Sequence, residues 1–363
     1  MKERTRVLVV DDSALMRELL SKLLARDPEI EVVGAARDGA SGLAAVERHK
    51  PDVITLDVEM PGLSGLEVLT RLRGKNVAVI VVASLLDTSC DLTVQALTLG
   101  AFDFVPKPIG MAALAALGPE LIAKVKAAAG GRRRFATSQA SRVAPAPGPA
   151  LRSASTGIAS PAPRDPPGGR EAVHPSRVGQ KLIAIGASTG GPEALAEVIQ
   201  AFPENAPPVL IVQHMPETFT AKFAQRLDGR SAMRVQEAVD GAAVRPGLVL
   251  LAPGSKRHMV LARSGHELVV RLVESDPIMH HRPSIDVLFQ SCAEVLGRRT
   301  VAALLTGMGS DGARGLLAMR RAGATTIAQD EATSVVYGMP MEAAALGAAM
   351  HILPLDEIGP SLV

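Results

Sequence analysis

Residues 7–13 read VLVVDDS, a continuous apolar run that stops at two aspartates. An apolar run without polar alternation is typical of a strand that a parallel sheet buries on both faces. Similar runs follow at Val53–Leu56, Val77–Val82 and Ala101–Val105. Leucines spaced for one helix face separate them, at Leu15, Leu19, Leu23 and Leu24 and again at Leu66, Leu69 and Leu72. This alternation predicts about five βα units in a doubly wound parallel sheet, with functional loops at the carboxyl ends of the strands.

Polar side chains follow these strand candidates at the same predicted sheet edge. Asp11, Asp12 and Asp57 end two of the runs, Ser84 follows the third and Lys107 follows the fourth. Three neighbouring carboxylates suit Mg²⁺, which prefers oxygen ligands. A phosphoryl group can then transfer to Asp57, with its oxygens contacted by Ser84 and Lys107. Because a single aspartate at a strand end is as often a helix cap, only the whole set supports this interpretation.

The set resembles the receiver domain of two-component response regulators over residues 4–127. The matching segments are VVDDS (9–13), LDVEMPG (56–62), AS (83–84) and FDFVPKP (102–108). The resemblance implies a flavodoxin-like (βα)5 fold with Asp57 as phosphoacceptor. It also implies that Mg²⁺ is bound by Asp11, Asp12, Asp57 and the main-chain carbonyl of Glu59, and that the phosphorylation switch consists of Ser84, Lys107 and Phe104. Packing in a core with few aromatic residues explains Phe104 equally well.

Composition sets broad limits on the whole chain. Its 363 residues suffice for two domains with separate cores. The net charge of +2 selects no partner class, and two distant cysteines exclude a disulfide scaffold and a cysteine zinc site. No apolar run reaches the roughly 18 to 20 residues that cross a bilayer, so we expect a soluble, cytoplasmic protein.

The composition changes between about Gly130 and Gly179, where Pro, Ala, Ser, Gly and Arg replace any apolar periodicity. This predicts a disordered linker over residues 128–179, between a domain at 1–127 and a second at 180–363. Eight arginines between Arg132 and Arg177 face only Asp165 and Glu171. A solvated spacer is one explanation for this charge, and contact with an acidic partner surface is the other.

A second α/β pattern begins after the linker and predicts a doubly wound, mixed-sheet domain. Closely spaced runs around Val249, Val260 and Val269 suggest antiparallel hairpins. The predicted strands are Leu182–Ile185, Val209–Val212, Leu248–Leu251, Met259–Ala262, Glu267–Val273, Val301–Leu305 and Thr325–Ala328. The predicted helices are Pro192–Gln200, Ser284–Leu296, Ala313–Arg321 and Glu342–Ala348.

A glycine-rich turn, GASTGG at residues 186–191, follows the first of these strands and precedes a helix. It satisfies the G-x-S-x-G pattern of a nucleophile elbow, which exposes Ser188 at a sharp turn beside helix N–H groups. A dinucleotide-binding loop is the alternative, although the spacing of the glycines misses G-x-G-x-x-G. No Lys-Ser or Lys-Thr pair follows, which excludes a P-loop.

A nucleophilic serine needs a base and an acid that orients the base. His214 ends the next strand and Asp311 follows the strand at Val301–Leu305, so both are expected at the same sheet edge. His258, His280 and His281 compete for the role of base, and Asp311 alone is as readily a helix cap. The order Ser, His, Asp differs from that of α/β-hydrolases, but geometry rather than order defines a triad.

Four segments of this half resemble the catalytic domain of chemotaxis protein-glutamate methylesterases, the CheB family, over residues 180–353. They are GASTGGP (186–192), QHMP (213–216), HRPSID (281–286) and LTGMGSDG (305–312). The resemblance implies a triad of Ser188, His214 and Asp311. It further implies an oxyanion-hole N–H at Met308, and substrate contacts by Thr189, His281 and Arg282.

The two resemblances together imply a phosphorylation-activated esterase. Its expected substrates are glutamate 5-methyl esters and selected glutamines of methyl-accepting chemotaxis receptors, and its phosphodonor is a histidine kinase of the CheA type. Mg²⁺ is expected at the receiver and no cofactor at the esterase site. We expect a monomer without nucleic-acid binding or membrane insertion. A non-enzymatic adaptor and a DNA-binding regulator are the rival functions, but no basic recognition helix supports the second.

Overall fold

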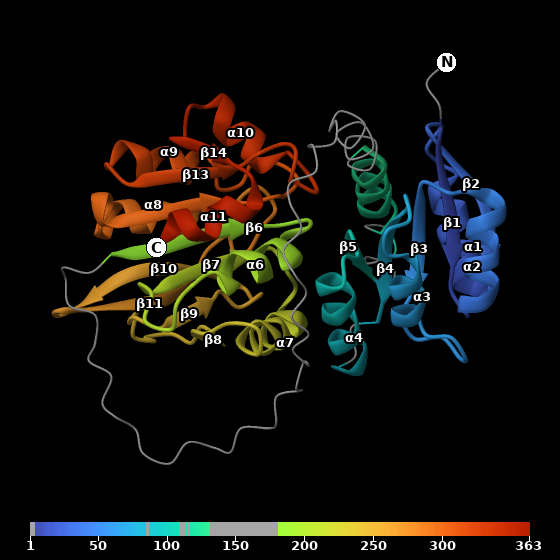
Figure 1. Ribbon diagram of the computed structural model, residues 1–363, viewed down its shortest axis with the longest axis horizontal. Helices are drawn as coiled ribbons and strands as arrows, with labels where there is room; N and C mark the ends of the chain where they lie inside the picture. Colours follow the sequence, from blue (N-terminus) through green and yellow to red (C-terminus); the bar gives the residue numbers. More distant parts are fainter. Residues whose placement is uncertain (1–3, 85–86, 109–113, 115–116, 131–180) are drawn as a thin grey trace, which may run out of the picture.

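The computed structural model describes residues 4–84, 87–108, 114, 117–130 and 181–363. These residues form two α/β domains, each with a sheet between helices (Figure 1). Strand β5 and helix α4 of the N-terminal domain face helices α6 and α7 of the C-terminal domain (Figure 1). The carboxyl end of strand β6 points toward this boundary, so the residues after β6 lie between the domains (Figure 1).

The N-terminal sheet is parallel throughout, with strand order β2-β1-β3-β4-β5. This is the flavodoxin-like order, so the predicted receiver fold is confirmed. Helices α2, α3 and α4 cover one face, and α1 and the helical residues 117–130 cover the other. The elements are β1 (Thr5–Val10), α1 (Ala14–Leu24), β2 (Ile30–Ala36), α2 (Gly39–His49), β3 (Val53–Asp57), α3 (Gly65–Leu72), β4 (Ala78–Ala83), α4 (Asp87–Thr98) and β5 (Asp103–Pro106).

The predicted start of the linker at residue 128 is wrong by three residues. Residues 117–130 are helical, and Ala128 and Ala129 are buried in the N-terminal core. Alanine is a strong helix former and small enough to pack here, whereas the proline- and arginine-rich composition begins only after Gly130. The rest of the predicted linker lies outside the described residues, up to residue 180.

The C-terminal domain is built on a seven-stranded sheet of order β14-β13-β12-β6-β7-β9-β8. Helices α6, α7 and α11 cover one face; α8, α9, α10 and the β10–β11 hairpin cover the other. The strands are β6 (Leu182–Ala187), β7 (Val209–Gln213), β8 (Arg234–Glu237), β9 (Leu248–Leu251), β10 (Arg257–Ser264), β11 (Glu267–Glu274), β12 (Thr300–Leu304), β13 (Thr325–Gln329) and β14 (His351–Leu353). The helices are α6 (Gly191–Gln200), α7 (Glu217–Asp228), α8 (Ile285–Val295), the 3-10 turn η1 (Gly297–Arg299), α9 (Ala313–Arg321), α10 (Met339–Ala345) and α11 (Leu355–Leu362).

The strand pairing corrects the prediction of a mixed sheet in the C-terminal domain. Every described pairing in the seven-stranded sheet is parallel, and the antiparallel pair β10–β11 forms a separate two-stranded sheet. Val260 and Val269 do lie in that hairpin, but Val249 lies in β9 beside β7. The chain between β8 and β9 runs back along β11, where Val244 and Ala242 exchange backbone hydrogen bonds with it. This return segment lets β8 and β9 pair in parallel.

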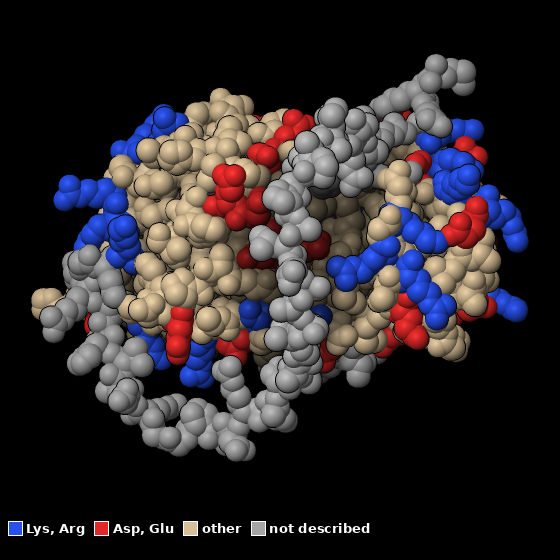
Figure 2. Space-filling view, in the orientation of Figure 1, with Lys and Arg blue, Asp and Glu red and all other residues tan. Residues whose placement is uncertain are grey.

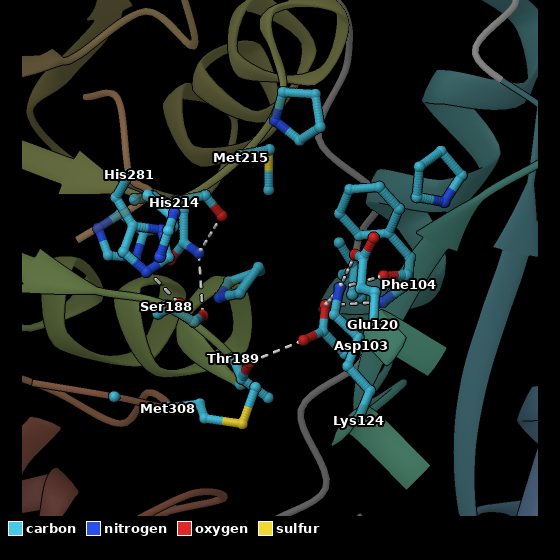
Figure 3. A pocket seen from close by; sticks show the side chains of 18 of the residues that line it. Asp103, Phe104, Glu120, Lys124, Ser188, Thr189, His214, Met215, His281 and Met308 are labelled. Atoms are coloured by element: carbon cyan, nitrogen blue, oxygen red, sulfur yellow. Dashed lines mark hydrogen bonds and ion pairs between the residues drawn. The ribbon is translucent and has the colours of Figure 1, made fainter. Parts of the chain in front are cut away.

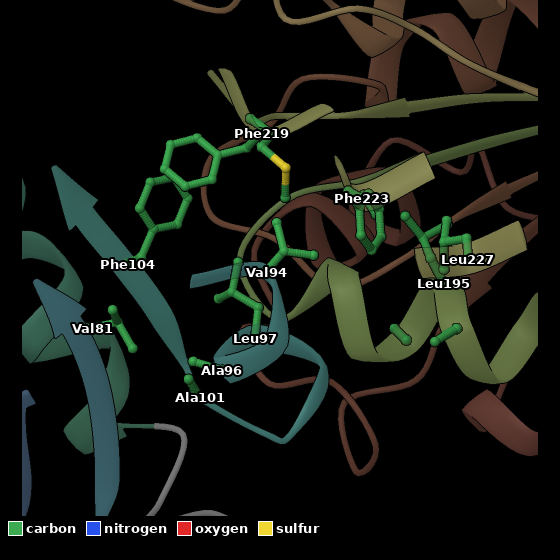
Figure 4. Close-up of a cluster of buried hydrophobic side chains, with 14 of the residues drawn as sticks. Val81, Val94, Ala96, Leu97, Ala101, Phe104, Leu195, Phe219, Phe223 and Leu227 are labelled. Carbon is green, nitrogen blue, oxygen red and sulfur yellow. The ribbon is translucent and has the colours of Figure 1, made fainter. Parts of the chain in front are cut away.

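One buried apolar cluster runs through both domains. It includes Val94 and Leu97 of α4, Leu195 of α6 and Phe223 of α7 (Figure 4). Because α4 packs on both α6 and α7, the two domains share part of one core in this arrangement. The receiver is thereby held against the carboxyl edge of the second sheet.

Candidate active site

Ser188 lies directly after β6, at the turn into α6. Two glycines make this turn possible. Gly190 has a φ of 76°, and a Cβ there would lie 2.5 Å from Val335. A Cβ on Gly191 would lie 2.0 Å from the side-chain oxygen of Gln213. A larger residue at either position would clash with these side chains, and Gly190 also holds a φ that other residues rarely adopt, so both glycines favour this presentation of the serine.

Ser188, His214 and Asp311 form a chain of hydrogen bonds (Figure 3 shows the first two). His214 Nδ1 lies 3.1 Å from Ser188 Oγ, and its Nε2 lies 2.8 Å from Asp311 Oδ2. The ionised carboxylate can only accept, so Nε2 carries the ring hydrogen and Nδ1 is free to accept from the serine. The three residues follow β6, β7 and β12, which lie close together in the sheet. The structure therefore brings together the three residues that the sequence singled out.

Asp311 is held by the N-terminus of α8. Ser284 Oγ and the backbone N–H of Ile285 each donate to it at 2.8 Å, and the N–H of Asp286 donates at 3.1 Å. Burial alone would raise the pKa of Asp311, but its bonds to His214, Ile285 and Ser284 hold that pKa below its usual range. The carboxylate thus stays ionised and oriented toward His214. The sequence interpretation gave Ser284 no role, although it stands inside the HRPSID segment.

The other histidines differ in what surrounds them. His258 is fully buried: its Nδ1 accepts from the backbone N–H of Ser284, and its Nε2 faces the carbonyl of Asp276. His280 is exposed. The ring of His281 lies flat against that of His214, with centroids 3.7 Å apart and an interplanar angle of 4°. Of the three rivals for the role of base, only His281 therefore contacts the triad.

A cavity of about 830 Å³ surrounds Ser188 and is lined by both domains. Met308, Thr189 and Arg282 line it from the C-terminal domain. Met308 is 38% exposed, and its N–H makes no hydrogen bond among the described residues. Arg282 donates to the carbonyl of Ser275 at 2.9 Å. The space beside the serine can therefore hold an extended side chain together with part of its backbone.

The receiver closes the other side of this cavity (Figure 3). Thr189 Oγ1 donates to Asp103 Oδ2 at 2.7 Å, across the domain boundary. Lys124 lies 3.3 Å from Asp103 and 3.0 Å from Glu120. Burial would lower the pKa of Lys124, but these two carboxylates raise it. A charged and paired group of the receiver thus stands opposite the nucleophile.

Further contacts also join the domains. The rings of Phe104 and Phe219 lie 4.6 Å apart (Figure 4). Lys222 of α7 lies 3.1 Å from Asp91 of α4, and Arg226 donates to Thr98. Phe104, expected as part of the phosphorylation switch, is therefore in direct contact with the C-terminal domain.

The acidic cluster of the receiver lies at the carboxyl edge of its sheet. Asp11, Asp12 and Asp57 offer oxygens within 4.8 Å of one another, and Asp11 and Asp57 are buried. Lys107 Nζ lies 2.6 Å from Asp57 and 3.3 Å from Asp11. Burial raises the pKa of both carboxyls despite this lysine. Asp11 Oδ2 is buried and makes no hydrogen bond, so the donor set fits a Mg²⁺ ion.

Two further predicted residues lie beside this cluster. Ser84 is one residue beyond β4, at the same sheet edge. The N–H of Glu59 donates to Asp57 at 3.1 Å, and the side chain of Glu59 accepts from Ser89. The side chain of Glu59 thus has a partner of its own, and the three aspartates supply the side-chain oxygens of the cluster. The main-chain carbonyl of Glu59 as a further ligand stays a prediction. On the face shown in Figure 2, acidic side chains gather near the middle of the molecule and basic ones toward its two ends.

No helix in the described part of the chain is long and apolar enough to span a membrane.

Residues 183–362 match the CheB methylesterase family, and residues 7–117 match the response regulator receiver domain. The chain is 46% identical over 359 residues to the protein-glutamate methylesterase/protein-glutamine glutaminase of Bordetella parapertussis, covering 98% of this chain and 95% of that protein. It is 45% identical to a protein of the same description, numbered 1, from Caulobacter vibrioides, covering 99% and 97%. The solved catalytic domain of Thermotoga maritima CheB methylesterase is 41% identical, with a TM-score of 0.49, covering 50% of this chain and 97% of that domain.

Proposed function

The chain belongs to the CheB methylesterase family and carries a response regulator receiver domain, and from this we propose that it is a phosphorylation-activated protein-glutamate methylesterase and glutamine deamidase. Its substrates are glutamate 5-methyl esters, and selected glutamines, of methyl-accepting chemotaxis receptors. The observation that supports this best is the hydrogen-bonded series Ser188, His214, Asp311 in a cavity wide enough for a side-chain ester. We assign the receiver to residues up to 130 and the catalytic domain to residues 180–363, and the protein acts as a monomer.

The chemistry is acyl transfer to the serine. Ser188 Oγ attacks the ester carbonyl carbon while His214 Nδ1 takes the hydroxyl proton, and Asp311 holds the Nε2–H and stabilises the imidazolium. The C–O bond to methanol breaks as His214 returns the proton to the leaving oxygen. Water then adds to the acyl-enzyme by the same route and releases glutamate. With a glutamine substrate, ammonia leaves in place of methanol.

The negative charge of the tetrahedral intermediate needs nearby donors. The N–H of Met308 points to this role because it is unpaired among the described residues and lies in a glycine-flanked loop that lines the cavity. The N–H of Thr189, next to the nucleophile, is likewise unpaired there. Each such donor is typically worth about 10²- to 10³-fold in rate.

The receiver supplies the control. In the arrangement described here, Asp103, Phe104 and Lys124 line the cavity opposite the nucleophile, and Asp103 bonds the residue next to it, so the receiver occupies one side of the space that a receptor must approach. A histidine kinase of the CheA type phosphorylates Asp57. Asp11, Asp12, Asp57 and the main-chain carbonyl of Glu59 would hold Mg²⁺, which would neutralise the phosphoryl charge. Ser84, Lys107 and Phe104 respond to the phosphoryl group. Shifting a closed-to-open ratio from 99:1 to 1:99 needs a bias of about 5.5 kcal/mol.

The test is methanol release from methylated receptor membranes. The parent and Ser188→Ala are compared with and without Mg²⁺ and a small-molecule phosphodonor. We expect release that needs Ser188 and rises with the phosphodonor. Equal release by Ser188→Ala would exclude the serine mechanism, and no release despite phosphorylation of Asp57 would favour a non-enzymatic adaptor.

A further inference from the structure

His281 stands at the end of a strained turn beside the triad. Ile278 and His281 exchange two backbone hydrogen bonds, of 3.1 and 2.8 Å, around Met279 and His280. Both central residues have positive φ, 50° and 69°. Glycine or asparagine usually occupies such positions, because a side chain there costs on the order of 1 kcal/mol. Non-glycine residues held in this conformation commonly mark a functional position.

The turn places the ring of His281 flat against the ring of His214. The imidazoles of His281 and His214 are stacked, with centroids 3.7 Å apart and planes within 4° of parallel. The described contacts of His281 include no hydrogen bond from its ring to Ser188 or Asp311. The contact that the structure shows between His281 and the triad is therefore the one through its flat face.

We propose that His281 is a positioning residue whose ring fixes the plane of His214, so that Nδ1 stays directed at Ser188 and Nε2 at Asp311. The proposal rests on the proposed function, in which His214 is the base. His214 makes its two hydrogen bonds through Nδ1 and Nε2. These two bonds still allow the ring to tilt about the line that joins the two nitrogens. A parallel ring in van der Waals contact prevents that tilt, and the turn holds that ring in place.

The protonation state of His281 suits this positioning role. Burial, with the neighbouring His214 and His280, lowers the pKa of His281 to about 4, while Asp311 acts in the opposite direction. His281 is therefore neutral near pH 7. A neutral aromatic face tolerates the imidazolium that forms on His214 during the reaction, whereas a second imidazolium would repel it. Asp103, Glu120 and Lys124 of the receiver and Arg282 of the C-terminal domain are the other charged groups that line this cavity.

The test compares a flat with a non-flat replacement in the full-length protein. His281→Phe keeps a flat ring that can stack on His214, whereas His281→Leu fills similar space without a flat ring. Methanol release is measured with Mg²⁺ and phosphodonor over a range of receptor concentrations. We expect His281→Leu to lower kcat roughly 10- to 100-fold with KM within twofold of the parent, because small misplacement of a catalytic group has effects of this size. His281→Phe should keep kcat within about threefold of the parent and leave the pH profile between pH 6 and 8 unchanged.

Other outcomes have distinct meanings. Equal kcat for the phenylalanine and leucine variants would overturn the positioning role. A raised KM with unchanged kcat in both would assign His281 to substrate contact instead. A shifted pH profile in His281→Phe would show that its proton is used, which also contradicts the proposal. If His281→Leu melts below the assay temperature, His281→Met replaces it. Release that persists in Ser188→Ala would overturn the proposed function itself, which separates that failure from this one.

Discussion

Thr189, the residue after the nucleophile, donates its hydroxyl hydrogen bond to Asp103 of the receiver at 2.7 Å. The acceptor is a carboxylate, the same group that the proposed reaction produces from its substrate. Asp103 in turn is paired with Lys124, which also pairs with Glu120. This hydrogen bond thus joins the residue next to the nucleophile to a charged group of the receiver.

Removing this contact should activate the enzyme without a phosphodonor. We expect Asp103→Ala to raise methanol release in the absence of phosphodonor severalfold and to reduce the further stimulation, because the closed arrangement loses a charge-assisted hydrogen bond. Lys181→Ala is a matched control, since Lys181 is exposed at the far end of β6 from Ser188. Unchanged release without phosphodonor would show that Asp103 does not hold the closed form.

The α4–α7 contacts should have a smaller effect of the same sign. Lys222 and Asp91 are a third to a half exposed, and such pairs are worth about 0.2–1 kcal/mol. We expect Lys222→Ala to raise activity without phosphodonor by no more than about fivefold. Combination with Asp91→Ala should add little, because the first change already removes the pair. An additive second increase would mean that the two side chains act separately.

Phosphodonor stimulation should require Asp57. We expect Asp57→Ala to reduce the ratio of stimulated to unstimulated methanol release to about one, because the phosphoryl acceptor is gone. The measurement is repeated with Mg²⁺ chelated, which should have the same effect on the parent. Equal stimulation of the variant and the parent would refute control through Asp57.

Ser284 should affect both stability and rate. Its hydroxyl accepts from Val287 N as the cap of α8 and donates to Asp311. We expect Ser284→Ala to lower the free energy of unfolding by roughly 2 kcal/mol and to lower kcat less than Ser188→Ala does. Ser291→Ala is the control, because Ser291 lies on the same helix and bonds Leu261 and Leu288, neither of which belongs to the triad. It should cost stability while leaving kcat near that of the parent.

The pKa of His281 predicts a pH dependence of stability. This pKa is about 4 in the folded protein and about 6.5 in an unfolded chain, so the unfolded state binds the proton first as the pH falls. The contribution to the free energy of unfolding is complete above pH 6.5 and is lost between pH 6.5 and 4. Urea unfolding at several pH values should therefore give a flatter curve for His281→Phe than for the parent. Parallel curves would contradict this assignment.

The sequence identified the residues that the structure brings together more fully than it predicted the arrangement of the domains. Asp11, Asp57, Ser188, His214 and Asp311 were all identified because each follows an apolar strand in a recognisable segment. Those segments are local, and parallel strands bring their carboxyl ends together without further information. The identity of the sheet-end residues therefore follows from patterns a few residues long.

Elements with weak apolar patterns were not predicted. Strand β2 contains Gly34 and two alanines, β14 has only three residues, and half of β8 is charged. Helix α7 was missed because two threonines, a glutamine and charged residues dilute its apolar face. The contact of Thr189 with Asp103 joins positions 86 residues apart in different domains, and nothing local in the sequence encodes it. The same holds for the stacking of His281 on His214.

The buried apolar cluster shared by the two domains makes their separation depend on temperature. Separation of the receiver from the catalytic domain must expose Phe104, Phe219 and Leu97, which are almost completely buried here. Hydration of that apolar surface gives the open form a higher heat capacity than the closed form. The enthalpy of domain separation therefore grows with temperature, so the closed-to-open ratio on which the phosphoryl group acts differs between a cold cell and a warm one.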